Sequence, residues 1–127
     1  YRVKQEDFRM IDEAIFESNI IDKPFIGFQN QFSVMQDNKH HMFKVIKGIG
    51  SYPNSQKEGV LYKNFYGTYL IGPVLVRNPY FLEYLIKKLV LTKDPNYKFK
   101  SFDLKEEKKA YETFINNFYK DIVKPNV

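Results

Sequence analysis

Cysteine and tryptophan are absent from this 127-residue chain, and histidine occurs only twice. Without cysteine, these residues can form no disulfide, no thiolate metal site and no cysteine nucleophile. No apolar run reaches the roughly 18 residues that a membrane-spanning helix needs, and no signal peptide is visible. We therefore expect a cytoplasmic protein. Because the chain begins at Tyr1, we also expect it to be part of a longer protein.

Motifs for metals, phosphates and hydrolases are sparse. His40 and His41 are neighbours, so in an extended segment their side chains point to opposite faces, which disfavours a joint metal site. A Ser–His pair stays open, although no G-x-S-x-G elbow is present. The glycine pair of residues 48–50 is an incomplete phosphate motif and is typical of a turn. The sequence thus indicates neither a metal nor a cofactor.

The chain is basic, with 20 Lys and Arg against 15 Asp and Glu, a net charge of +5. Most lysines stand beside acids, as in residues 105–109, and no five like charges occur together, which favours a solvated surface. Aromatic residues make up 17%, and aromatics interleaved with lysines can stack on bases. A small basic nucleic-acid-binding or protein-interaction module is therefore the alternative reading, with a basic stripe on one face as its mark. An aromatic core is favoured.

The first half of the chain reads mainly as strands. Residues 1–18 fit helical and strand spacing equally well, while 23–30 (KPFIGFQN) and 41–47 (HMFKVIK) predict strands. In the former, Gly27 marks a bulge or a close approach of backbone. Polar residues 31–39 and glycine-rich residues 48–59 predict connections, and 60–71 predicts further strand.

Two helices are expected in the second half. Asn78 can cap a helix with Pro79 at its first position, and the helix should fade near Thr92. A last helix is expected from Asp103, with Glu106 completing a capping-box variant, and Pro125 should end it. The expected apolar faces are Leu82, Leu85, Ile86 and Leu89 in the first helix and Ala110, Tyr111, Phe114, Ile115, Phe118 and Ile122 in the second.

Four short segments together resemble a known family. Residues 67–79 (GTYLIGPVLVRNP) resemble the G-T-Y-L-H-G-P-L-L-x-x-N-P segment of class I glutamine amidotransferases of the cobyric acid synthase type. Within these amidotransferases, the chain most resembles the small glutaminase subunit of lipid II isoglutaminyl synthase. The lead-in at 58–64 (EGVLYKN) is similar to the segment that precedes the motif in that subunit. Residues 26–31 (IGFQNQ) resemble its G-F-E-N-H-G-G stretch, and residues 9–18 an R-x-I-G-D-x-x-x-E-S stretch.

The resemblance implies a flavodoxin-like domain with a Cys–His glutaminase site, and it also shows what is missing. The family's catalytic histidine falls on Ile71, and its G-F-E-N-H histidine falls on Gln31. Isoleucine can neither accept a proton from a thiol nor pass one to a leaving amine. Arg9 matches the arginine that contacts the glutamine substrate. Its alternative role is a surface charge at the start of a strand.

We therefore expect a single α/β domain over residues 1–127. It would be the C-terminal portion of a flavodoxin-like class I amidotransferase, with a mixed sheet and two C-terminal helices. The resemblance implies amidation of a peptidoglycan or cobyrinate-type precursor, without glutaminase activity of its own, beside a Mur-ligase-like synthetase subunit. An intact glutaminase whose missing half comes from another chain is a rival, which Ile71 disfavours. Exposed apolar surface would lead to a partner or to a homo-oligomer, with residues 8–28 as the contact.

Overall fold

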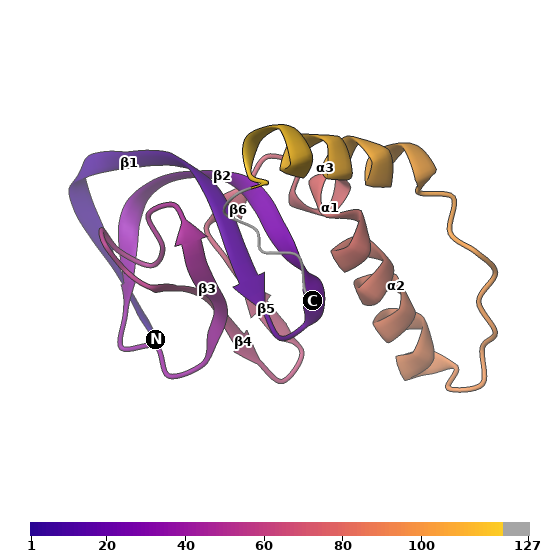
Figure 1. The fold of residues 1–127 in the computed structure, drawn as a ribbon. Coiled ribbons are helices and arrows are strands. Elements are labelled where there is room, and N and C mark those ends of the chain that lie inside the picture. Colours follow the sequence, from indigo (N-terminus) through magenta and orange to yellow (C-terminus); the bar gives the residue numbers. More distant parts are fainter. Residues whose placement is uncertain (121–127) are drawn as a thin grey trace. The chain divides into compact units, whose positions relative to one another are not determined.

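The computed structural model describes residues 1–120, which group into two compact units, residues 1–74 and the chain from residue 75 onward. The first unit is a six-stranded sheet in the order β5-β4-β3-β1-β2-β6 (Figure 1). The strands are β1 (Arg2–Ser18), β2 (Ile21–Gln36), β3 (His41–Lys47), β4 (Lys57–Tyr62), β5 (Phe65–Gly67) and β6 (Leu70–Ile71). The second unit is helical. Whether the whole chain is one domain stays a prediction.

The two longest strands form one hairpin, β1–β2, closed by the two residues 19–20. Pairing with β2 decides the ambiguous residues 1–18 in favour of a strand, because a whole ladder of backbone hydrogen bonds becomes available. The expectation of a loop over residues 31–39 is wrong for its first part, since β2 runs to Gln36. Polar residues fit there because Gln31 and Ser33 find hydrogen-bond partners inside the fold.

All five strand pairings among the described residues are antiparallel. The expectation of a mixed sheet is therefore wrong for this part of the chain. For the β1–β2, β3–β4 and β4–β5 pairs the physical reason is the connections of two to nine residues, since a parallel pair needs a crossover of a dozen or more residues. A flavodoxin-like fold is built on parallel strands, so that part of the expectation gains no support here. The coarser expectation, a fold with both strands and helices, is confirmed.

The prediction of strand over residues 60–71 is confirmed with two interruptions, at 63–64 and 68–69. Gly59 lies where β4 and β5 approach each other, with φ of +74°. A Cβ atom at Gly59 would lie 2.9 Å from the carbonyl oxygen of Gly67, so no larger residue fits there without a backbone shift. The core of the sheet unit centres on aromatic rings: Phe43 packs 5.2 Å from Phe16 and 4.7 Å from Phe25, measured between ring centroids.

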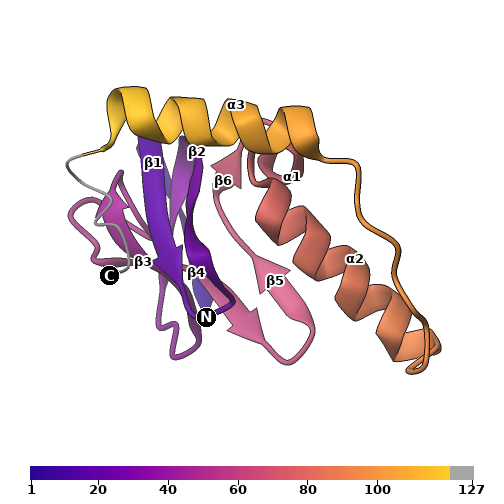
Figure 2. The same cartoon turned by 45° about the vertical axis from the view of Figure 1, so that its right-hand side comes forward.

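The helical unit contains α2 (Pro79–Lys93) and α3 (Lys105–Phe118), while the one-turn α1 (Val74–Arg77) begins at the division between the units. Both expected helices are confirmed, with Pro79 in the first turn of α2. Neither helix has a side-chain cap: Asn78 makes no capping hydrogen bond, and α3 begins two residues later than Asp103. In Figures 1 and 2, α2 diverges from α3 toward the connecting loop.

That divergence corrects the expected apolar faces. Tyr80 donates a hydrogen bond to Glu112 of α3 from the first turn of α2, whereas Leu89 in its second half is 69% exposed. On α3, Tyr111 and Ile115 are buried as expected, but Ala110 is exposed and Phe118 is 68% exposed. The expected face position at Ile122 and the stop at Pro125 lie outside the described residues. Among residues 1–120, no helix is long and apolar enough to cross a membrane.

Candidate functional site

The four family-like segments meet in the sheet unit, although they are far apart in sequence. In the β1–β2 pair, Ile11 lies opposite Asn30, and in the β2–β6 pair, Phe28 lies opposite Ile71. The G-T-Y-L segment thus lies directly beside the I-G-F-Q-N-Q strand, which lies beside the strand that carries Arg9. The lead-in segment joins them through Glu58, which hydrogen-bonds to Thr68.

One face of this part of the sheet carries Arg9, Asn30 and Ile71. The Arg9 guanidinium donates a hydrogen bond to Asn30 Oδ1 at 2.9 Å and lies over the Phe32 ring, 5.6 Å from its centroid. Residues 28, 30 and 32 share a face because side chains alternate along a strand. Opposite Phe28, Ile71 therefore faces the same side, and its side chain is 44% exposed. The structure brings the predicted substrate arginine and the family's histidine position to one accessible surface.

The opposite face carries a buried amide network that sequence analysis missed. Gln29 is fully buried, and its Oε1 accepts hydrogen bonds from the backbone N–H groups of Ile49 and Gly50. Its Nε2 donates to Gln31 Oε1 at 2.9 Å and to the Gly50 carbonyl at 3.1 Å. Gln31, at the family's second histidine position, is 3% exposed and is therefore part of this core rather than of an open site. The network fixes the turn at residues 48–50 to β2.

Glu58 is the second buried polar group that the sequence did not reveal. Its side chain is 0% exposed, and its two oxygens accept hydrogen bonds from the Thr68 hydroxyl at 2.7 Å and the Tyr69 N–H at 2.6 Å. Burial raises the pKa of Glu58 to about 7 from its ordinary 4.5, while these two hydrogen bonds act in the opposite direction. The sequence drew attention to Glu58 only as the first residue of the family-like segment 58–64, and nothing in that segment specified its hydrogen-bond partners.

The segment between Gly67 and Ile71 is held from three sides. Glu58 holds it from β4, and the Tyr69 hydroxyl forms a 2.8 Å hydrogen bond with Ser33 Oγ of β2. Leu70 is buried over Gly27, where a Cβ atom would lie 2.5 Å from Leu70 Cδ1. The expected close approach at Gly27 is thus confirmed, and Ile71 is presented at a defined place at the edge of the sheet.

The two histidines do not form a site. His40 packs on Tyr62 with 4.7 Å between ring centroids, and His41 Nδ1 lies 3.4 Å from Asn38 Nδ2. Burial, followed by the charge of Lys57, lowers the pKa of His41 below its ordinary 6.5. Within residues 1–120, no cluster of three or more His, Asp or Glu side chains could hold a metal ion. The face that carries Ile71 offers the Arg9 guanidinium and the Asn30 amide for binding. Position 71 itself carries a hydrocarbon side chain and cannot act as a base.

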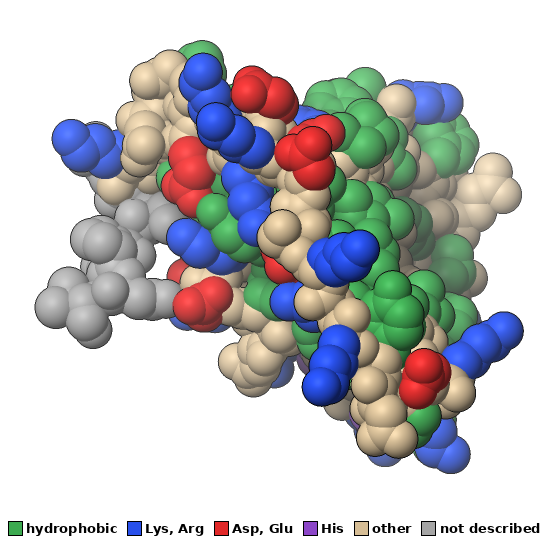
Figure 3. Space-filling model, turned by 90° about the vertical axis from the view of Figure 1, so that its right-hand side faces the viewer, with side chains coloured by type: hydrophobic (Ala, Val, Ile, Leu, Met, Phe, Trp, Pro, Cys, Tyr) green, Lys and Arg blue, Asp and Glu red, His purple; other side chains and the backbone are tan. Residues whose placement is uncertain are grey.

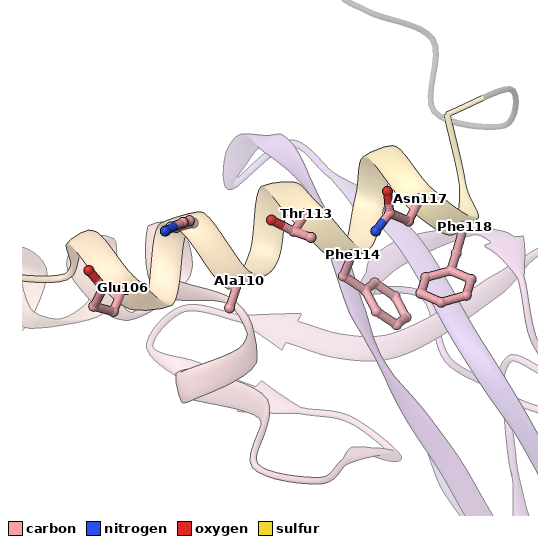
Figure 4. A pocket seen from close by; sticks show the side chains of 7 residues that line it. Glu106, Ala110, Thr113, Phe114, Asn117 and Phe118 are labelled. Atoms are coloured by element: carbon pink, nitrogen blue, oxygen red, sulfur yellow. The ribbon is translucent and has the colours of Figure 1, made fainter.

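The helical unit has a hollow of its own on α3, with a volume of about 470 Å³. Phe114 and Phe118 project from the same side of the helix, and polar side chains stand beside them (Figure 4). Figure 3 shows hydrophobic side chains gathered in a band on one face of the molecule. Large apolar side chains of the helical unit that are exposed are Leu75, Val76, Leu89, Leu91, Tyr97 and Phe118. The hollow contains no arrangement of nucleophile and base.

Comparison with known proteins relates the chain to subunits of a glutamine-hydrolysing synthase. It is 30% identical over 108 residues to the GatD subunit of lipid II isoglutaminyl synthase from Staphylococcus aureus (strain N315), covering 85% of this chain and 44% of that protein. It is 31% identical over 80 residues to the GatD subunit from Streptococcus pneumoniae (strain ATCC BAA-255 / R6), covering 61% of this chain and 31% of that protein. No protein-family profile matches.

The chain thus spans less than half the length of these two relatives. Both relatives are named as lipid II isoglutaminyl synthase subunits, which supports the predicted relation of this chain to that family. The narrower prediction, of a cobyric acid synthase type and a C-terminal portion, stays a prediction.

Proposed function

We propose that the chain is a GatD-like amidotransferase region that does not hydrolyse glutamine with its own residues. The observation that carries this proposal is Ile71. It occupies the family's histidine position on the face that also carries Arg9, in a chain without cysteine. A glutaminase of this kind needs a thiolate nucleophile and a base that moves the proton, and the hydrocarbon side chain of isoleucine can serve as neither.

Arg9 is proposed to retain the family's substrate contact. A guanidinium presents several N–H donors in a planar fork that matches a carboxylate, such as the α-carboxylate of glutamine. The hydrogen bond to Asn30 and the Phe32 ring restrain the Arg9 side chain on the open face. The region would therefore bind glutamine or a similar amino acid without cleaving it.

The partner would be a Mur-ligase-like synthetase subunit, as the family resemblance implies. The pathway would be amidation of a peptidoglycan precursor, which the name of the relatives, lipid II isoglutaminyl synthase, supports. The proposed C-terminal, cobyric-acid-synthase-type assignment belongs with this proposal. Within the predicted contact region 8–28, Phe8 and Ile11 are 47% and 56% exposed and are the residues that could contact such a partner. The nucleic-acid alternative gains no specific observation, because Lys44, Lys47 and Lys108 each lie beside a carboxylate.

A titration of the ¹⁵N-labelled chain with L-glutamine, together with an ammonia assay, tests the proposal. We expect amide shifts around Arg9, Asn30 and Ile71, and no ammonia release above the buffer control. Arg9→Ala should weaken binding at least about tenfold, the usual loss when one charge-assisted contact of about 1.5 kcal/mol is removed. Arg2→Ala removes another exposed β1 arginine, paired with Asp37, and should leave binding unchanged.

Two results would contradict the proposal. Ammonia release that persists after repeated purification would show that these residues do carry out the chemistry. Glutamine binding that is equal in the Arg9→Ala and Arg2→Ala proteins would remove Arg9 from the site.

A further inference from the structure

We propose that Glu58 makes the docking of the segment Thr68–Ile71 depend on pH, and so determines how firmly residue 71 is held against β2. The inference goes beyond the proposed function and does not require it, because it rests on contacts within the sheet unit. Glu58 lies ten and eleven residues before its two partners, so it joins β4 to a segment that has no backbone pairing at residues 68–69.

The contacts form a short relay from the buried carboxylate to β6. Glu58 Oε2 accepts from the Thr68 hydroxyl, and Thr68 Oγ1 in turn accepts from the Leu70 N–H at 2.9 Å. Glu58 Oε1 accepts from the Tyr69 N–H. Three consecutive residues are therefore oriented by one side chain. β6 itself contributes only two register pairs with β2, so this relay is a large share of what positions Ile71.

Both the ionised and the protonated form of Glu58 can make these hydrogen bonds, but the free energy of burying them differs. The carboxylate accepts both hydrogen bonds, yet it holds a charge where water is excluded. The protonated acid can donate to Thr68 Oγ1, which has a free lone pair, while its other oxygen still accepts from Tyr69. If the segment opens and Glu58 meets water, the ionised form gains hydration. Opening is therefore favoured as Glu58 becomes ionised.

The sign of the effect follows from the pKa of Glu58, about 7 when buried against an ordinary 4.5. The closed segment is tightest below about pH 4.5 and loosens as the pH rises through 7. The difference between the two pKa values limits the change in the opening equilibrium to about 300-fold. Above pH 7 the effect levels off.

Other titrating groups near Glu58 can be told apart from it. The pKa of His41 is lowered from its ordinary 6.5, which is within the pH range over which Glu58 acts, so a His41→Asn variant and not the pH midpoint separates the two. The Tyr69 hydroxyl is engaged with Ser33. The other titratable or charged residues on the strands and segment packed around Glu58 are His41, Lys44 and Lys47 on β3, Lys57 and Tyr62 on β4, Tyr66 on β5 and Tyr69.

Hydrogen exchange of the full chain, measured by NMR from pH 5 to 8, tests the inference. Protection factors at Tyr69 and Leu70, corrected for the intrinsic rate at each pH, should fall as the pH rises, by up to about 70-fold over this range. Glu58→Gln, which cannot titrate, should abolish the pH dependence. Glu13→Gln, which changes an exposed carboxylate paired with Lys47, should leave it intact, and so should His41→Asn.

Thr68→Val gives a second route if Glu58→Gln does not fold. This substitution removes the hydroxyl whose hydrogen bond favours the ionised form of Glu58. The pKa of Glu58 should therefore rise, and the fall in protection factors should move to higher pH. The inference is overturned if the wild-type protection factors do not change with pH, if they fall equally in Glu58→Gln, or if the midpoint is unmoved by Thr68→Val. An equal fall at the Val45 amide, which bonds to Gln56 elsewhere in the sheet unit, would assign the effect to global unfolding and overturn it as well.

Discussion

The sheet unit and the helical unit satisfy their polar groups in different ways. In the sheet unit, Gln29, Gln31 and Glu58 are buried, and each is tied to backbone or side chains 2 to 21 residues away. In the helical unit, polar contacts such as Glu83 with Lys87 and Lys108 are only partly buried, and large apolar side chains are exposed. The sheet unit therefore depends on buried polar contacts, which are costly to break, and the polar contacts of the helical unit are partly open to solvent.

The largest change in stability should follow from removing an aromatic ring from the core of the sheet unit. Phe16 is fully buried, so Phe16→Ala should lower the free energy of unfolding by about 3–5 kcal/mol, through lost burial and the cavity left behind. Denaturant titration measures it. Phe118→Ala, at a 68% exposed position of the helical unit, should change stability by less than about 0.5 kcal/mol. Equal losses in the two variants would remove the contrast between the units.

A smaller loss is expected from the buried amide network. Gln29→Leu keeps the volume of the side chain but leaves the N–H groups of Ile49 and Gly50 without their acceptor. It should therefore destabilise the chain by about 2–3 kcal/mol. Asn30→Ala changes the neighbouring residue on the exposed face and should cost less than about 1 kcal/mol. A Gln29→Leu protein as stable as Asn30→Ala would mean that water replaces the lost acceptor.

The smallest effect should come from the surface charges of the helical unit. The hydrogen bond from Lys108 is the main cause that lowers the pKa of Glu83, with Lys87 contributing. Glu83→Gln should cost about 0.2–1 kcal/mol at neutral pH and low salt. Because the folded-state pKa is lowered, this stability is present above pH 4.5 and is lost as the pH falls through the folded value. A cost that persists at acidic pH or in high salt would point to packing instead.

Local patterns were sufficient for some elements and not for others. The alternation of residues 41–47 and the Asn78-Pro79 start predicted β3 and α2 correctly, because both signals are local. Residues 1–18 stayed ambiguous and the loop expected over residues 31–36 was wrong, since only pairing between β1 and β2 makes a polar stretch such as Gln31–Gln36 a strand. The family resemblance drew the expectation toward a mixed sheet, because the two-residue β1–β2 connection is not apparent while residues 1–18 fit helix and strand equally well.

The candidate site was predictable only in part for the same reason. Short motifs identified Arg9 and Ile71; the hydrogen bond to Asn30 places Arg9, and the β2–β6 register places Ile71, on one face. The motif around Glu58 was recognised as a resemblance, but its partners Thr68 and Tyr69 lie on another strand connection, and burial cannot be read from a single glutamate in sequence. Gln29 was missed because a glutamine in a strand is usually a surface residue.

The length of the strands has a consequence for self-association. β5 and β6 are the edges of the sheet and contain only three and two residues, so they offer little unpaired backbone to a second copy. Behind β6 lies β2, which is sixteen residues long and pairs with β6 at only two of them. Detachment of β6 would free the backbone of β2 at Phe28 and Gln29. A two-residue strand therefore covers a two-residue part of that edge, and pairing of a second copy at this part of β2 would require the release of β6.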